Sequence, residues 1–147
     1  IADGLTDPHN LGSILRTANA AGAHGVIIPR NRSVSVTGTV AKVSAGAVEH
    51  IRVARVTNIA QTLEQLKKEG LWIVGTDLSA EQYHYDSDLK CALGIVIGSE
   101  GEGMSRLVRE KCDFLVKIPM IGEIESLNAS VAAGILLYEA VRQRRHE

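Results

Sequence analysis

The chain has 147 residues, a formal net charge of −1, and 22% charged against 45% hydrophobic positions. This length predicts one domain that buries roughly 70% of its unfolded surface, and the high apolar content excludes a disordered chain. No stretch reaches the roughly 18 consecutive apolar residues of a membrane span, so we expect a soluble protein, located in the cytoplasm. The overall charge lacks the basic excess of many nucleic-acid binders and so gives no global sign of such a partner.

Helical and strand patterns alternate through the first half of the chain. Asn10 is a candidate N-cap of a helix that continues to a stop at Gly22. The apolar run at 26–29 is typical of a buried strand, and the segment 37–48, rich in Ala, Gly and Val, predicts a short helix. Residues 52–56 alternate charged and apolar positions, which predicts a half-exposed strand.

The second half continues this alternation. Helices are predicted at 58–70, where Asn58 is the cap, at 104–112 and at about 127–144, and strands at 71–74, 92–97 and 114–118. Most of the strands are continuous apolar runs, which is typical of a parallel sheet covered by helices on both faces. The sequence therefore predicts one α/β domain over residues 1–147.

Two cysteines, Cys91 and Cys112, lie far apart in the chain and not in a zinc-binding spacing. We expect both thiols to be reduced. The five histidines are scattered without metal-ligand spacing, so no metal site is predicted. The chain begins at Ile1 without a signal peptide or an initiator methionine, and we expect it to be a piece of a longer protein.

Ligands of parallel sheets bind beyond the carboxyl ends of the strands, so the loops there are the candidate sites. The loop at 98–103 has the order G-x-x-G-x-G, which is neither the dinucleotide fingerprint nor a Walker A loop. Glu100 and Glu102 would repel a phosphate, so a neutral or cationic ligand fits this loop better. A tight turn whose acidic residues help to cap the next helix explains the loop equally well.

A second loop, 119–128, precedes the last helix. Ser126 or Asn128 is a candidate N-cap of that helix. The apolar residues Ile118 and Met120 beside these polar groups suit a slot of the size of adenine.

A third loop, 7–12, is followed one turn later by Arg16. If the N-terminus of this helix faces the same cleft as the other loops, Asn10 and Arg16 both project into the cleft. Otherwise Asn10 is a helix cap and Arg16 is a solvated charge.

Basic residues gather between positions 29 and 56, where Glu49 is the single acid. The candidate RNA-binding residues of this segment are Arg30, Arg32, Lys42, Arg52 and Arg55. Such side chains suit phosphate contacts, although a run of charge is more often a solvated face.

Three motifs, at 10–17, 97–103 and 118–139, resemble in this order those of the SpoU (TrmH) family of RNA ribose 2′-O-methyltransferases. The resemblance extends from the first residues to about Arg144. Within the family, the chain is most similar to enzymes that methylate a guanosine of large-subunit ribosomal RNA.

The resemblance implies an S-adenosylmethionine-dependent catalytic domain that has a deep C-terminal trefoil knot and acts on RNA as a homodimer. By position, it implies cofactor contacts from Gly98, Ile118, Met120 and Leu127. It implies a catalytic cluster of Asn10, Arg16, Glu100, Ser126 and Asn128. Ala129 stands where relatives often carry Val, and nothing here corresponds to the N-terminal RNA-binding domain of many members, so we expect the catalytic domain alone.

Three alternatives remain beside this interpretation. A tRNA could replace ribosomal RNA as the substrate, and a non-catalytic RNA-binding or assembly module could share the fold. The complete set of Asn10, Arg16, Glu100 and Asn128 argues against such a module. The order of the glycines and the acidic loop argue against a dinucleotide-dependent oxidoreductase.

Overall fold

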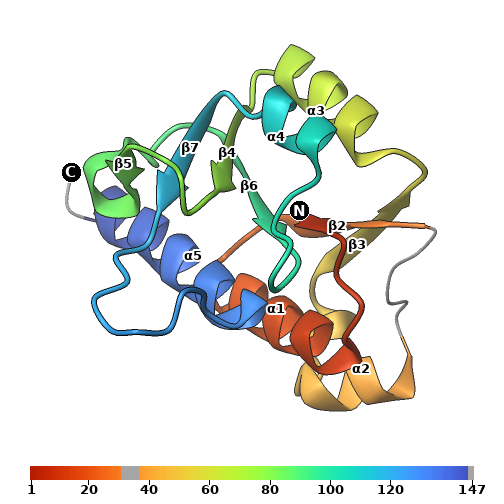
Figure 1. Cartoon of the computed structure of the whole chain (residues 1–147). Coiled ribbons are helices and arrows are strands. Elements are labelled where there is room, and N and C mark those ends of the chain that lie inside the picture. Colours follow the sequence, from red (N-terminus) through yellow and green to blue (C-terminus); the bar gives the residue numbers. More distant parts are fainter. Residues whose placement is uncertain (31–36, 146–147) are drawn as a thin grey trace.

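Seven strands and five α-helices alternate along the part of the chain that the computed structural model describes, residues 1–30 and 37–145 (Figure 1). The strands are β1 (Ala2–Asp3), β2 (Gly25–Pro29), β3 (Arg52–Val56), β4 (Trp72–Thr76), β5 (Gln82–Tyr83), β6 (Leu93–Gly98) and β7 (Phe114–Lys117). The α-helices are α1 (Pro8–Ala20), α2 (Gly38–Val43), α3 (Ile59–Lys68), α4 (Arg106–Lys111) and α5 (Ala129–Arg145). Short 3-10 helices at Ala47–Glu49 and His84–Asp86 complete the set.

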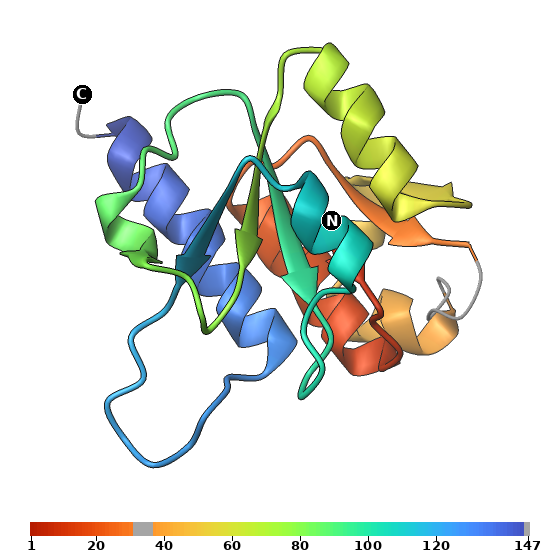
Figure 2. The ribbon, with the colours of Figure 1, turned by 45° about the horizontal axis from the view of Figure 1, so that its top comes forward.

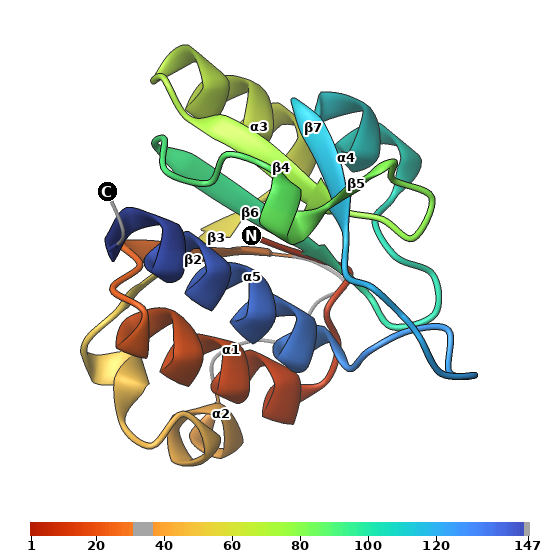
Figure 3. The same cartoon turned by 90° about the vertical axis from the view of Figure 1, so that its left-hand side faces the viewer.

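Every strand pair that the described residues form is parallel. Five strands pair in the order β1-β6-β4-β7-β5, and β2 pairs with β3 beside them, next to β1. Helices α1 and α5 cover one face, and α3 and α4 cover the other (Figure 3). The predicted α/β fold with a mostly parallel sheet between helices is confirmed.

The apolar core has two parts, one on each face of the sheet. Neighbouring residues of β4 supply both parts, because side chains alternate across a strand. Val74 belongs to the same buried cluster as Leu15 of α1 and Leu136 of α5, whereas Ile73 belongs to the cluster that contains Leu63 of α3. This alternation explains why β4 is a continuous apolar run.

The first helix begins earlier than the sequence predicts. Asp7, not Asn10, is its N-cap: the Asp7 carboxylate accepts a hydrogen bond from the backbone nitrogen of His9 at 2.8 Å, and Pro8 occupies the first turn. Asn10 lies inside the helix and is only 7% exposed. Its side chain is therefore available for a tertiary contact, and its prediction as a cap was wrong.

The other long elements lie near their predicted positions. Asn58 caps α3, as expected, by accepting from the backbone nitrogen of Gln61 at 3.0 Å. The strands β1 and β5 were not predicted, because two-residue strands are too short to produce a pattern. Both cysteines are free, as predicted. Among the described helices, none is long and apolar enough to cross a bilayer.

Candidate ligand-binding site

The carboxyl ends of β4, β6 and β7 meet at one edge of the sheet, because these strands run parallel. Figure 2 shows the loop from β6 to α4 and the long loop from β7 to α5 extending from this edge. Between them lies a cavity of about 420 Å³, within the usual range for small-molecule sites. Its walls come from residues 76–78, 97–104 and 116–118, from Arg106 and Arg109 of α4, and from Met120, Ser126, Leu127, Ala129 and Ala132.

The loop after β6 folds back on the end of its own strand. A Cβ atom on Gly98 would lie 2.2 Å from the carbonyl carbon of Gly103, so only glycine fits at this position. Ser99 and Gly103 exchange two backbone hydrogen bonds, at 2.9 and 3.2 Å. Gly101 and Gly103 have φ angles of 84° and 72°, which favour glycine. This tight turn brings bare backbone to the cavity and exposes Glu100 and Glu102 at its mouth.

Six of the nine predicted catalytic and cofactor-binding residues line this cavity. They are Gly98, Glu100, Ile118, Met120, Ser126 and Leu127. Ile118, Met120 and Leu127 are half-buried and make the inner wall largely apolar, whereas the carboxylate of Glu100 lies at the open side. The arrangement suits a flat apolar group inside and a positive charge near the mouth.

Asn10 and Asn128 do not line the cavity, but they contact each other. The Asn128 amide nitrogen donates to Oδ1 of Asn10 at 2.9 Å, which links α1 to the start of α5. Oδ1 of Asn128 accepts from the backbone nitrogens of Ser130 and Val131, so Asn128 is the N-cap of α5. Of the two predicted caps of this helix, Asn128 is correct, and Ser126 lies exposed in the loop.

Arg16 lies exposed on α1, less than two turns beyond Asn10, and does not line the cavity. The candidate RNA-binding residues Arg30, Lys42, Arg52 and Arg55 are also exposed. They gather around β2, β3 and α2, away from β7 and its loop (Figure 1). Arg32 lies outside the described residues.

Sequence reasoning missed one wall of the cavity. Thr76 ends β4 and Asp77 and Leu78 follow it, and Arg109 of α4 lies beside Asp77. Their place at the carboxyl end of a strand is the signal that could have identified them, but no structure was predicted for the polar stretch 77–90.

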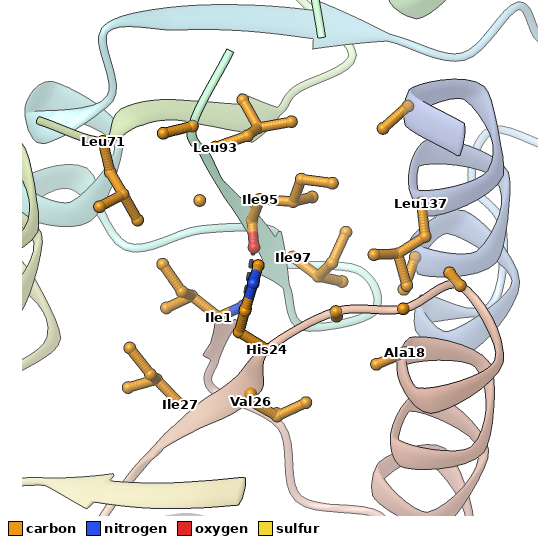
Figure 4. Close-up of a pocket in the computed structure, with 18 of the residues that line it drawn as sticks. Ile1, Ala18, His24, Val26, Ile27, Leu71, Leu93, Ile95, Ile97 and Leu137 are labelled. Atoms are coloured by element: carbon orange, nitrogen blue, oxygen red, sulfur yellow. Dashed lines mark hydrogen bonds between the residues drawn. The ribbon is translucent and has the colours of Figure 1, made fainter. Parts of the chain in front are cut away.

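A larger cavity of about 850 Å³ lies elsewhere, between β6 and β2 (Figure 4). Residues of β6 line one side of this cavity and residues of β2 line the other. The Ile1 nitrogen, which donates to the carbonyl oxygen of Ile95, also lies among the lining residues. Its walls are mainly aliphatic, with Leu93 and Val26 on opposite sides, and it contains no predicted catalytic or cofactor-binding residue. The smaller cavity is therefore the candidate site.

The fold and this site define a class: an α/β protein with a cavity walled by glycine backbone and apolar side chains at the carboxyl edge of its parallel sheet, where small ligands bind in such folds. The profile of the SpoU rRNA methylase family matches residues 1–138. The chain therefore belongs to the SpoU methylase family, as its motifs predict.

Curated relatives share most of this chain. The TrmH-family protein YacO of Bacillus subtilis is 62% identical over 144 residues, which are 98% of this chain and 58% of YacO. A TrmH-family protein of Staphylococcus saprophyticus is 61% identical over 146 residues, which are 99% of this chain and 59% of that protein. The chain thus spans a little under three fifths of these relatives.

Solved structures show the same fold. The SpoU methyltransferase AviRb of Streptomyces viridochromogenes, in complex with AdoMet, superposes with a TM-score of 0.93 at 35% identity, over 99% of this chain and 60% of AviRb. The TrmH/SpoU tRNA modifying enzyme of A. aeolicus superposes with a TM-score of 0.89 at 33% identity, over 98% of this chain and 73% of that enzyme.

Proposed function

We propose that this chain is the catalytic domain of an enzyme that transfers a methyl group from S-adenosylmethionine to a ribose 2′-hydroxyl in structured RNA. The observation that carries the proposal is the cavity at the carboxyl edge of the sheet, where six residues of the family motifs meet. The likeness to AviRb, whose structure contains AdoMet, supports the same ligand here.

The residues of the cavity fit this ligand. The half-buried side chains of Ile118, Met120 and Leu127 provide an apolar slot for an adenine ring, and Gly98 lets the ligand approach the backbone closely. When bound, S-adenosylmethionine supplies a methyl group on a cationic sulfonium. The negative charge of Glu100 at the cavity mouth favours such a cation, whereas it would disfavour a phosphate.

The transfer forms a bond between the ribose O2′ and the methyl carbon while the bond from that carbon to sulfur breaks, and the proton of the hydroxyl leaves. The 2′-hydroxyl is a weak nucleophile, so the protein has to align it and stabilise the negative charge that develops on O2′. Arg16 supplies a fixed positive charge for this purpose. A guanidinium stays protonated, so Arg16 acts by electrostatics and positioning, and an RNA phosphate is the candidate proton acceptor.

Asn10, Ser126 and Asn128 position the reacting ribose. The hydrogen bond between the two asparagines fixes the start of α1 relative to the start of α5. Ser126 lies two residues before Asn128 on the cavity wall, so its hydroxyl can orient the ribose.

The RNA substrate contacts the exposed basic residues Arg30, Lys42, Arg52 and Arg55 through its phosphates, and Arg32 belongs to the same basic segment. We favour a guanosine of large-subunit ribosomal RNA, methylated in the cytoplasm. A tRNA is the second candidate substrate, favoured by the likeness to the tRNA modifying enzyme of A. aeolicus.

Residues 1–147 would form only the catalytic domain, and an RNA-binding domain would precede it in the whole enzyme. We extend the proposal to the C-terminal trefoil knot and the homodimer that the family motifs imply. Small residues of α5, among them Ala129 and Ala132 at the cavity wall, allow the close chain passage that a knot requires.

Calorimetry with S-adenosylhomocysteine tests the proposed cofactor site. The wild-type protein should bind the ligand, and Leu127→Arg, which places a long cation in the apolar slot, should abolish binding while the protein stays folded. Leu107→Arg is the matched control, because Leu107 is exposed on α4 and does not line the cavity. Normal binding by Leu127→Arg would place the cofactor elsewhere.

A further inference from the structure

One arginine of α4 holds the loop that follows β4. The Nε atom of Arg109 lies 3.0 Å from Oδ2 of Asp77, and its Nη2 atom donates to the hydroxyl of Ser79 at 2.8 Å. A single guanidinium thus contacts two residues of the loop at once. Because a guanidinium is planar and rigid, this two-point contact fixes the orientation of the loop as well as its distance from α4.

The loop is also ordered from within. The carboxylate of Asp77 accepts from the backbone nitrogen of Ser79 at 2.8 Å and from the Ser79 hydroxyl. Burial pulls the pKa of Asp77 upward, but the hydrogen bonds from Ser79 and the charge of Arg109 together lower that pKa below its usual value. Asp77 is therefore ionised at neutral pH, when it can pair with Arg109.

These contacts lie at the wall of the proposed cofactor cavity. Thr76, Asp77 and Leu78 form one side of it, and Arg109 forms part of the rim. The backbone nitrogen of Asp77 also donates to the carbonyl oxygen of Val116 in β7 at 3.0 Å. The loop is thus tied on one side to β7, which leads to Ile118, and on the other to α4, which follows the glycine loop.

We propose that Arg109 is a positioning residue that holds this wall in the shape required by the S-adenosyl ligand. The inference rests on the proposed function and assigns a role to a residue outside the family motifs. Without the guanidinium, the loop would have to be ordered when the ligand binds, and that entropic cost lowers affinity. The side chain of Arg109 is 46% exposed and that of Asp77 is 21% exposed, so their pair contributes little to the stability of the fold.

The test compares Arg109→Ala with Lys111→Ala in the full-length protein. Lys111 lies on the same helix and makes an equivalent ion pair, at 2.9 Å from Glu64 of α3, but it does not line the cavity. We expect Arg109→Ala to raise the Kd for S-adenosylhomocysteine by about three- to tenfold with little change in Tm, and Lys111→Ala to leave the Kd unchanged. Arg109→Lys, which keeps the charge and loses the second contact, should lie in between.

A double-mutant cycle gives the second readout. Asp77→Ala should also raise the Kd, and the double variant should lose less affinity than the sum of the two single losses, because both changes break the contact between Arg109 and Asp77. Wild-type affinity in Arg109→Ala would overturn the positioning role of Arg109, and so would equal losses of affinity in Arg109→Ala and Lys111→Ala. Neither result would contradict the proposed function. No binding by the wild-type protein would overturn the proposed function as well.

Discussion

The side chain of Asn128 joins the N-termini of two helices. It caps α5 through its oxygen and donates to Asn10 of α1 through its nitrogen, across 118 positions of sequence. The cap was predictable, because Asn in front of a helical pattern is a local signal. The contact with Asn10 was not predictable, because no local sequence pattern shows that the starts of α1 and α5 lie close together.

Replacing Asn128 separates its two contacts. Asn128→Ala removes both and should lower the free energy of unfolding by about 2 kcal/mol, about half from the cap and half from the hydrogen bond. Asn128→Ser keeps a capping oxygen and should lose only about half as much. Urea denaturation measures the difference, and equal losses in the two variants would show that the cap contributes nothing.

Arg16 is the residue on which the chemistry depends in our proposal, although it lies outside the cavity walls. Arg16→Lys keeps the positive charge but loses the planar fork of donors, so we expect it to lose most of its turnover and still bind S-adenosylhomocysteine. Steady-state methyl transfer and calorimetry check the two parts. Near-normal turnover in this variant would remove Arg16 from the reacting centre.

At the scale of elements, the sequence predicted the long helices and the apolar strands, whose periodicity extends over several residues. It did not predict β1 or β5, because such short strands form only by pairing with distant strands, here β6 and β7. The cavity wall at residues 76–78 was missed because the polar stretch 77–90 has no periodicity, although the wall lies at the end of a predicted strand.

Two helical glycines show how closely these elements pack. A Cβ on Gly12 of α1 would lie 2.7 Å from the Cβ of Val43 and 3.1 Å from the carbonyl oxygen of Val40, whereas one on Gly134 of α5 would lie 3.5 Å from the methyl group of Thr17. The first approach is too close, and the second is an ordinary contact. Helix α2 thus packs onto α1 at a position that only glycine allows.

The two glycines should therefore respond to alanine with opposite signs. Gly134→Ala should stabilise the protein by up to about 1 kcal/mol, because alanine is the better helix former. Gly12→Ala should destabilise it by about 1–3 kcal/mol through overpacking against α2. Adding Val43→Ala to Gly12→Ala should recover part of that loss. Thermal and urea unfolding of the variants measure these changes in stability. If both glycine substitutions stabilised the protein, the close packing of α2 on α1 would be contradicted.

At the scale of the whole molecule, the net charge of −1 conceals an uneven distribution. Basic side chains lie exposed around β2, β3 and α2, and acidic ones lie at the mouth of the cavity. The composition alone therefore argued against a nucleic-acid partner that the local charge favours. The motifs, rather than the totals, indicated the function.

Large apolar side chains also remain exposed on the loop before α5 and on α5 itself. Ile121 is 97% exposed and Ile124 is 73% exposed, and Val131 and Tyr138 lie two turns apart on one side of α5, each about half exposed. We expect this surface to bury itself in the proposed homodimer.

Light scattering after size exclusion tests that expectation. The full-length protein should have the mass of a dimer, and the double variant Val131→Arg with Tyr138→Arg should have the mass of a monomer. Leu107→Arg, on exposed α4, should stay dimeric. A monomeric wild-type protein would exclude the proposed dimer. A dimeric double variant would place the dimer interface elsewhere.

Methyl transfer to the ribose is the central claim. The most direct measurement incubates the full-length protein with tritiated S-adenosylmethionine and RNA from cells that lack the enzyme, and then hydrolyses the RNA with alkali. A 2′-O-methyl group blocks cleavage at its own nucleotide, so we predict that the label appears in alkali-stable dinucleotides of the ribosomal RNA fraction. Label in mononucleotides, which indicates methylation of a base, or no label in any RNA would contradict the account.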